Sequence, residues 1–141
     1  MSLNRFALMA ACFALASCVQ PQQAQQHAAN EPAQQVRGAS SGVRQQIAEF
    51  YYVNSDCTSG GYPLLKVAKP PQHGQISVEQ GTAYADYTKD STHAACNGKK
   101  VPATLIFYTS EPGFVGSDSA AFDRIGVLGA YGYHDYTINV R

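Results

Sequence analysis

The amino-acid sequence predicts an all-β fold, a two-sheet sandwich of about seven short strands. Between residues 43 and 141, apolar positions recur with a period of about two rather than about 3.6, which is the spacing of strands. Glycine and proline interrupt this pattern at regular intervals, as turns between short strands require. The same range holds all nine tyrosines, which favour strands. We therefore expect one sandwich domain over residues 43–141.

The expected strands follow one another along the domain. The first covers 46–53, where a helix over 43–50 is the competing interpretation. The later strands are expected at 64–68, 75–79, 82–88, 104–109, 120–128 and 131–140. In the last of them, alternation places His134 on the same face as Tyr136 and Ile138. The first and last strands are expected at or near the sheet edges.

Residues 1–17 have the composition of an export signal peptide. Arg5 supplies a positive charge, and the apolar run that follows is shorter than the roughly 20 residues that span a bilayer. The run ends in Leu15, Ala16, Ser17 and Cys18, which resembles the lipobox of bacterial lipoproteins. In that family a diacylglycerol is attached to the cysteine thiol, the signal peptide is cut before it, and the new amino terminus is acylated, typically with palmitate. The resemblance implies a membrane anchor on Cys18.

Residues 18–42 join this cysteine to the domain and are rich in glutamine and alanine. Such a composition buries too little apolar surface to fold, so we expect a disordered tether with a reach of roughly 25 to 30 Å. Val19 stands where inner-membrane lipoproteins carry an aspartate. The resemblance therefore implies a location in the bacterial cell envelope, at the outer membrane, on either its periplasmic or its surface face.

Two segments of the domain resemble the cadherin-like and Ig-like repeat domains of bacterial cell-surface proteins. They are Lys-Pro-Pro-Gln-His-Gly-Gln-Ile-Ser-Val at 69–78 and Phe-Tyr-Thr-Ser-Glu-Pro-Gly-Phe-Val-Gly-Ser-Asp-Ser at 107–119. The likeness covers 65–140 and implies a single Ig-like or cadherin-like sandwich. The chain departs from the pattern in Ser110-Glu111-Pro112 and in an inserted stretch at 90–101.

Four residues in these segments have expected structural roles. Gly74 and Gly116 suit turns with positive φ. Phe114 can close the open end of the sandwich, and Asp118 can accept hydrogen bonds from backbone amides in its turn.

Two cysteines remain in the domain after export, Cys57 and Cys96. In an oxidising compartment such a pair predicts a disulfide, worth roughly 3 to 4 kcal/mol for a loop of about 40 residues. The alternatives are free thiols, or a zinc site that both cysteines form with His73 and His93.

Four tyrosines are candidates for partner binding: Tyr51, Tyr52, Tyr131 and Tyr133. An outward tyrosine combines apolar area with a polar tip, which suits a binding surface. The alternative is that these rings pair across strands inside the fold.

The formal net charge is zero, with ten basic and ten acidic residues, which argues against a nucleic-acid partner. No Gly-x-Ser-x-Gly elbow or other catalytic constellation occurs, so we expect no enzyme activity, no catalytic residues and no cofactor. The sequence predicts a non-enzymatic binding or accessory module for an envelope protein or polysaccharide. The alternative is a small-ligand or metal-binding lipoprotein that uses His73, His93 and His134.

Overall fold

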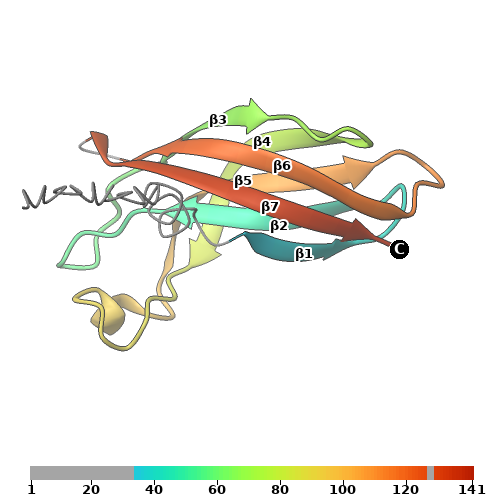
Figure 1. Ribbon diagram of the computed structural model, residues 1–141. Coiled ribbons are helices and arrows are strands. Elements are labelled where there is room, and N and C mark those ends of the chain that lie inside the picture. Colours follow the sequence, from blue (N-terminus) through green and yellow to red (C-terminus); the bar gives the residue numbers. More distant parts are fainter. Residues whose placement is uncertain (1–33, 127–128) are drawn as a thin grey trace, which may run out of the picture. The chain divides into compact units, whose positions relative to one another are not determined.

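The computed structural model describes residues 34–126 and 129–141 (Figure 1). The predicted signal peptide at 1–17, the lipid site Cys18 and the tether as far as residue 33 lie outside the described residues. Among the described residues, no helix is long and apolar enough to cross a membrane.

The described chain folds into two β-sheets packed face to face, as the sequence predicts (Figure 1). One sheet has four strands in the order β1-β7-β6-β3, and the other has three in the order β2-β5-β4. All neighbouring strands are antiparallel except β1 and β7. The strands are β1 (Gln35–Ala39), β2 (Arg44–Tyr51), β3 (Leu64–Lys69), β4 (Gly74–Tyr84), β5 (Lys100–Ser110), β6 (Gly116–Ile125) and β7 (Tyr131–Val140).

The main core lies between the two sheets. It forms because alternate residues of each strand point to the same side, so one face of every long strand can be apolar. The largest side chains that this packing buries completely are Ile106, Tyr108, Phe122, Tyr136 and Ile138. Each contributes roughly 1.5 to 3 kcal/mol of burial energy, which makes this layer the main source of stability.

A second, smaller core lies on the opposite face of the three-stranded sheet. Val101 alternates away from Ile106 and packs with Val53, Ala85 and Cys96. The cover is the loop that follows β4, which carries the 3₁₀ turn η2 (Ala94–Cys96). The inserted stretch at 90–101 therefore shields one end of this sheet from water.

The prediction of a tether over all of 18–42 is wrong for Gln35–Ala39, which forms β1. This strand pairs in parallel with β7, from Gln35 opposite Tyr136 to Ala39 opposite Val140. Its composition resembles that of a linker, but main-chain pairing with β7 and the burial of Ala39 supply the stabilisation that its own side chains lack. The predicted domain boundary at residue 43 is therefore too late.

Two predicted strands, 75–79 and 82–88, form the single strand β4 and its continuation. Gly81 does not break the strand. It lies opposite Ala103, and the pairing of β4 with β5 continues on both sides of it. A Cβ at this position would come within 2.6 Å of Leu105, so the glycine makes room for that side chain. The helix considered at 43–50 does not form, because β2 occupies this segment.

Strand β5 begins at Lys100, earlier than the predicted residue 104, and includes a proline. Pro102 pairs with Thr82 of β4, whereas the pairing of β5 with β2 ends at Ala103. The missing N–H of the proline therefore costs no hydrogen bond to β2.

Candidate binding surface

Strand β7 carries two of the predicted binding tyrosines on its outer face. Tyr131 lies directly opposite Ile125 of β6, which in turn lies opposite Leu64 of β3. Opposed residues of neighbouring strands share a face, so these three side chains form one row across the sheet. They are 65%, 42% and 64% exposed, in the order Tyr131, Ile125 and Leu64. We call this row, together with the 39% exposed Tyr133, the tyrosine strip.

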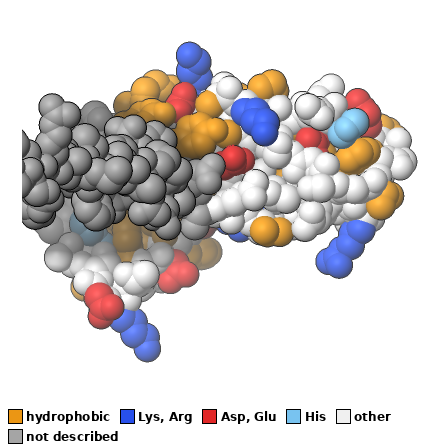
Figure 2. All heavy atoms as spheres, in the orientation of Figure 1, with side chains coloured by type: hydrophobic (Ala, Val, Ile, Leu, Met, Phe, Trp, Pro, Cys, Tyr) orange, Lys and Arg blue, Asp and Glu red, His pale blue; other side chains and the backbone are white. Residues whose placement is uncertain are grey.

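Polar groups border the tyrosine strip on one side. Tyr133 lies opposite Asp123, and Asp123 lies opposite Lys66. The Tyr131 hydroxyl donates a 2.5 Å hydrogen bond to Asp123 Oδ1. This bond raises the pKa of the Tyr131 hydroxyl and holds the ring in place. Figure 2 shows hydrophobic side chains gathered over the end of the four-stranded sheet where β7 begins.

The other two predicted binding tyrosines pack elsewhere. Tyr51 meets Tyr87 edge to face, and its hydroxyl accepts a 2.7 Å hydrogen bond from the backbone N–H of Asp86. The ring of Tyr52 lies so close to Gly60 that a Cβ there would come within 2.0 Å of it. Both rings are half-buried at the three-stranded sheet, so the structure does not bring the four tyrosines together.

The three candidate ligand histidines are also held apart. His73 stacks on Phe114 with 4.3 Å between ring centroids, and His93 lies 5.2 Å from Tyr87. His134 packs 4.6 Å from Phe50. In the part of the chain that the structure describes, no group of three His, Cys, Asp or Glu side chains could hold a metal ion.

His134 lies on the core-facing side of β7, together with Tyr136 and Ile138. Its Nε2 atom accepts a 3.3 Å hydrogen bond from Arg124 Nε. Burial, and then the positive charge of Arg124, lower the pKa of this imidazole below its ordinary value. The ring is therefore neutral at neutral pH and acts as a packed side chain between the sheets.

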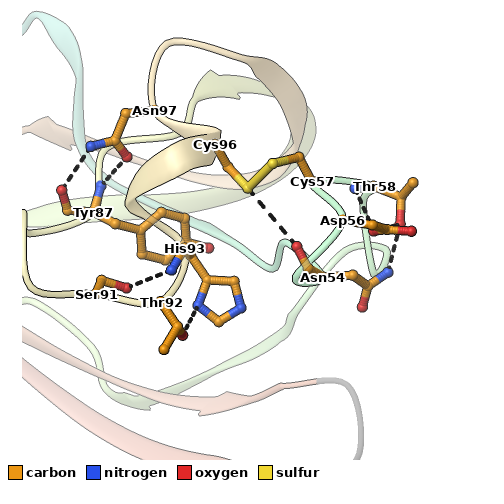
Figure 3. The surroundings of a disulfide bond; sticks show 10 residues. All are labelled: Asn54, Asp56, Cys57, Thr58, Tyr87, Ser91, Thr92, His93, Cys96 and Asn97. Carbon is orange, nitrogen blue, oxygen red and sulfur yellow. Dashed lines mark hydrogen bonds between the residues drawn. A yellow bond between two sulfur atoms is a disulfide. The ribbon is translucent and has the colours of Figure 1, made fainter.

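Cys57 and Cys96 form the predicted disulfide, with 5.3 Å between their Cα atoms (Figure 3). It joins the loop after β2 to η2, and Cys96 is almost completely buried. Around it, Asn97 Oδ1 accepts from the N–H of Tyr87 and Asn97 Nδ2 donates to the Tyr87 carbonyl, as Figure 3 shows. The disulfide thus fixes the cover of the second core, and both cysteines are used structurally.

Asp118 has the predicted role as an acceptor of backbone amides, and it is buried. Its carboxylate accepts from the N–H groups of Gln72, His73 and Ser119 at 2.8 to 3.0 Å, and from the Tyr108 hydroxyl at 3.0 Å. Burial alone would raise the pKa of this carboxyl, but the four hydrogen bonds outweigh it and leave the pKa below its ordinary value. The carboxylate therefore ties the turn before β4 to β6.

The two glycines of the resembled segments have different reasons to be glycine. Gly116 has φ of +145°, as predicted, and its turn lies against Phe114, which packs on the main core. The prediction of a positive φ at Gly74 is wrong. Gly74 is required because a Cβ there would lie 2.5 Å from the Tyr108 ring.

A groove of about 360 Å³ opens between β1 and β2, and sequence reasoning missed it. Its walls include Gln35 and Arg37, both of which fall in the segment predicted as tether. The alternating placement of Val36 and Arg37 is too short a signal to distinguish a strand from a linker.

No protein-family model, no curated protein and no solved structure matches this chain. The function proposed for it therefore depends on the geometry of its own residues.

Proposed function

We propose that the chain is a lipid-anchored, non-enzymatic module of the bacterial cell envelope that binds a partner protein through the tyrosine strip. One observation carries the proposal: Tyr131, Ile125 and Leu64 form a contiguous exposed row on the outer face of the four-stranded sheet. Scattered single apolar residues are normal on a protein surface, but a contiguous row favours an interaction site.

The chemistry of the strip favours a protein partner over a polysaccharide. Leu64 and Ile125 offer aliphatic surface, which gains most from contact with other apolar side chains. Tyrosine anchors near the centre of an interface commonly dominate its binding energy. Asp123 and Lys66, next to the strip, supply charges of both signs for a polar rim.

The anchor is proposed from the lipobox-like string that ends in Cys18. Acyl chains on Cys18 would bind the membrane through buried methylenes, each worth about 0.8 kcal/mol. Two or three such chains would keep the protein on the membrane almost permanently. The glutamine-rich segment after it gives the domain reach. The missing aspartate at Val19 supports the outer membrane as the location.

Metal binding by the histidines, the alternative expected from the sequence, finds no support in the geometry. His73 stacks on Phe114, His134 packs against Phe50 with its ring tilted, and His93 lies next to Tyr87. Packed aromatic contacts of this kind account for all three residues as structural.

Site-specific photocrosslinking in cells tests the proposal. A photoreactive phenylalanine analogue replaces Tyr131 in one variant and Tyr84 in the other. Tyr84 is the matched control, because it is 64% exposed and lies on β4 of the other sheet. We expect a discrete protein adduct from position 131 and none of the same mass from position 84. Equal labelling at both positions, or none at 131, would refute a binding role for the strip.

A further inference from the structure

Strand β4 forms one edge of the three-stranded sheet, and among the described residues it pairs with β5 alone. Its backbone N–H and C=O groups that point away from β5 therefore have no strand partner. The strand is eleven residues long, and its pairing with β5 runs without a register shift from Gly74 to Tyr84. It contains no lysine, arginine or proline. A long, regular edge of this kind can accept another strand.

The other three edge strands of the two sheets are protected against such pairing. Strand β1 has only five residues. A register shift interrupts β2 between Gln46 and Ala48, and another interrupts β3 between Val67 and Lys69. Strand β3 also carries two lysines, and Pro70 follows it. Short length, bulges, lysine and proline are the features that keep natural sheets from pairing at their edges, and among the described edge strands β4 alone lacks all of them.

An apolar side chain is left exposed at the β4 edge. Val78 lies opposite the core residue Ile106, yet it is 38% exposed. Beside it, a groove of about 270 Å³ opens between β4 and β3, and Leu65 and Thr104 also line this groove. Because Val78 points to the core side of its sheet, a strand added to β4 would extend the apolar layer and cover this side chain.

We propose that β4 pairs antiparallel with β4 of a second copy of this chain, which joins two three-stranded sheets into one continuous sheet. The two-fold axis of such a pair stands perpendicular to the sheet, so opposed residues share a face and the axis passes through one residue of β4. An axis at Glu79 would place two carboxylates directly opposite each other, which is unfavourable. An axis at Val78 avoids this contact, brings the two exposed valines together, and places residues 74–82 of one copy opposite 82–74 of the other.

The charges at this edge complement a second copy. Glu79 is the only charged residue of β4, and with the axis at Val78 it lies opposite Ser77 of the second copy. Arg44 reaches across β5 to both positions, because its Nη2 lies 3.4 Å from Ser77 Oγ and donates to Glu79 Oε1 at 2.5 Å. The arginine of each copy therefore lies within reach of Glu79 of the other, and the two copies can exchange ion pairs across the axis. An axis at Gln80 would move Glu79 away from this arginine.

The pairing goes beyond the partner binding proposed above and does not rest on it. The tyrosine strip lies on the outer face of the other sheet, so it stays exposed when β4 is paired. A two-fold pair also closes on itself, because each copy uses its β4 edge once. We therefore expect a dimer and no larger assembly through this edge.

Disulfide trapping in intact cells tests the proposal. A cysteine is placed in the full chain at Val78 or at Val67, which have nearly the same exposure, 38% and 36%. Val67 is the control, because it lies on the protected strand β3. After mild oxidation we expect Val78→Cys to give about tenfold or more disulfide-linked dimer than Val67→Cys, because two copies of position 78 face each other at a distance that a disulfide spans. The native cysteines are the same in both variants, so any dimer through them appears equally in each.

A third cysteine variant tests the register. Gln80 lies on the same strand and on the same face as Val78, but the proposed pairing places it opposite Ile76 of the second copy. Two copies of position 80 are then too far apart for a disulfide. Gln80→Cys should therefore give as little dimer as Val67→Cys.

Native mass spectrometry of the full chain, released from detergent, tests the pairing without introduced cysteines. We expect a dimer for the unchanged chain and a monomer for Glu79→Lys, because the new lysine lies next to Arg44 of both copies. The matched control is Glu49→Lys, since Glu49 and Glu79 lie on opposite sides of Leu105 on the same face of the sheet. This control should remain a dimer. Both variants should fold, because exposed charged pairs contribute little to stability.

The proposal would be overturned by equal trapping at positions 78 and 67, or at positions 78 and 80. A monomeric unchanged chain, or a Glu79→Lys variant that remains as dimeric as Glu49→Lys, would also overturn it. Trapping of position 78 to a different protein would show that another strand occupies this edge, and it would exclude the second copy as the occupant.

Discussion

At the scale of single residues, the buried carboxylate of Asp118 has the most consequential chemistry. It is the acceptor for three backbone amides and for the Tyr108 hydroxyl, so its removal would leave buried donors without partners. The sequence predicts that Asp118 accepts amides of its own turn, which holds for the N–H of Ser119. The bonds from the N–H groups of Gln72 and His73 join β6 to the distant turn before β4, and no local pattern predicts them. The bond of Asp118 to Tyr108 is not predictable either, because β5 and β6 must pack before these residues meet.

Asp118→Asn is expected to lower the free energy of unfolding by about 2 to 4 kcal/mol, because the charged acceptor is lost inside the fold. Asp123→Asn, on the outer face of the same strand, is the control and should change it by less than about 0.5 kcal/mol. Urea denaturation at pH 7 measures both. A loss at Asp118 no larger than that at Asp123 would contradict the structural role.

The same carboxylate predicts a dependence on pH. The folded-state pKa of Asp118 lies below its ordinary value of 3.8, so on acidification the unfolded chain takes up this proton first. Its contribution is therefore fully present above about pH 4 to 5 and is lost as the pH falls through the folded-state pKa. Denaturation from pH 7 to pH 3 should show the difference between the unchanged chain and Asp118→Asn shrinking. A difference that stays constant would refute this assignment.

At the scale of elements, β1 shows where sequence reasoning fails. Five residues with glutamine, glycine and alanine carry too weak a pattern to indicate a strand, and β1 exists because β7 offers it an edge. A long strand with sustained alternation was predictable, as in β7, which covers the predicted residues 131–140. The two segments taken as separate strands around Gly81 were not predicted as one, because glycine is also a turn residue.

Paired substitutions test whether β1 is a structural strand. Ala39→Glu places a charge in the main core and should destabilise the domain by at least about 2 kcal/mol. Val36→Glu alters an exposed side chain of the same strand and should have an effect below about 0.5 kcal/mol. Equal, small effects in thermal or urea unfolding would mean that this segment behaves as a tether.

A second prediction at the scale of elements concerns the contribution of the disulfide to stability. Replacing Cys57 and Cys96 together by serine opens a loop of 39 residues and should cost roughly 3 to 4 kcal/mol in the chain-entropy model. The amides of the loop that carries η2 should then lose their protection from hydrogen exchange before the amides of the main core do. A loss below about 1 kcal/mol would show that the cover holds without the bond.

At the scale of the whole molecule, the sequence predicted the sandwich and the disulfide. The sandwich follows from the local alternation of apolar residues, and the disulfide follows from the number of cysteines in the domain. The sequence also indicated Tyr131 and Tyr133 as candidate binding residues, but it could not predict which side chains lie next to them on the sheet. Leu64 and Ile125 join these tyrosines only through the register of three strands, which no local pattern records. The first and last predicted strands were expected at or near the sheet edges, and they are: β2 is an edge strand, and β7 is next to the edge strand β1. Because β7 has neighbours on both sides, the proposed tyrosine strip presents side chains and not an open strand edge.

The membrane anchor has its own test. Mass spectrometry of the mature chain should find Cys18 as an acylated amino terminus, and Cys18→Ser should accumulate as an uncut, unlipidated precursor. Cys57→Ser is the control and should leave processing unchanged, because this cysteine lies in the disulfide of the domain. An unmodified Cys18 inside the mature chain would remove the basis for the proposed location.

The affinity of the partner for strip variants tests the central claim most directly. With the crosslinked protein purified, calorimetry compares the unchanged chain with Tyr131→Ser and with the control Tyr84→Ser, which has the same exposure on the other sheet. We expect Tyr131→Ser to lose about 1 to 3 kcal/mol of binding energy with its unfolding curve unchanged, and Tyr84→Ser to bind normally. Equal affinities of the two variants for the partner would contradict the claim that the tyrosine strip is the binding surface.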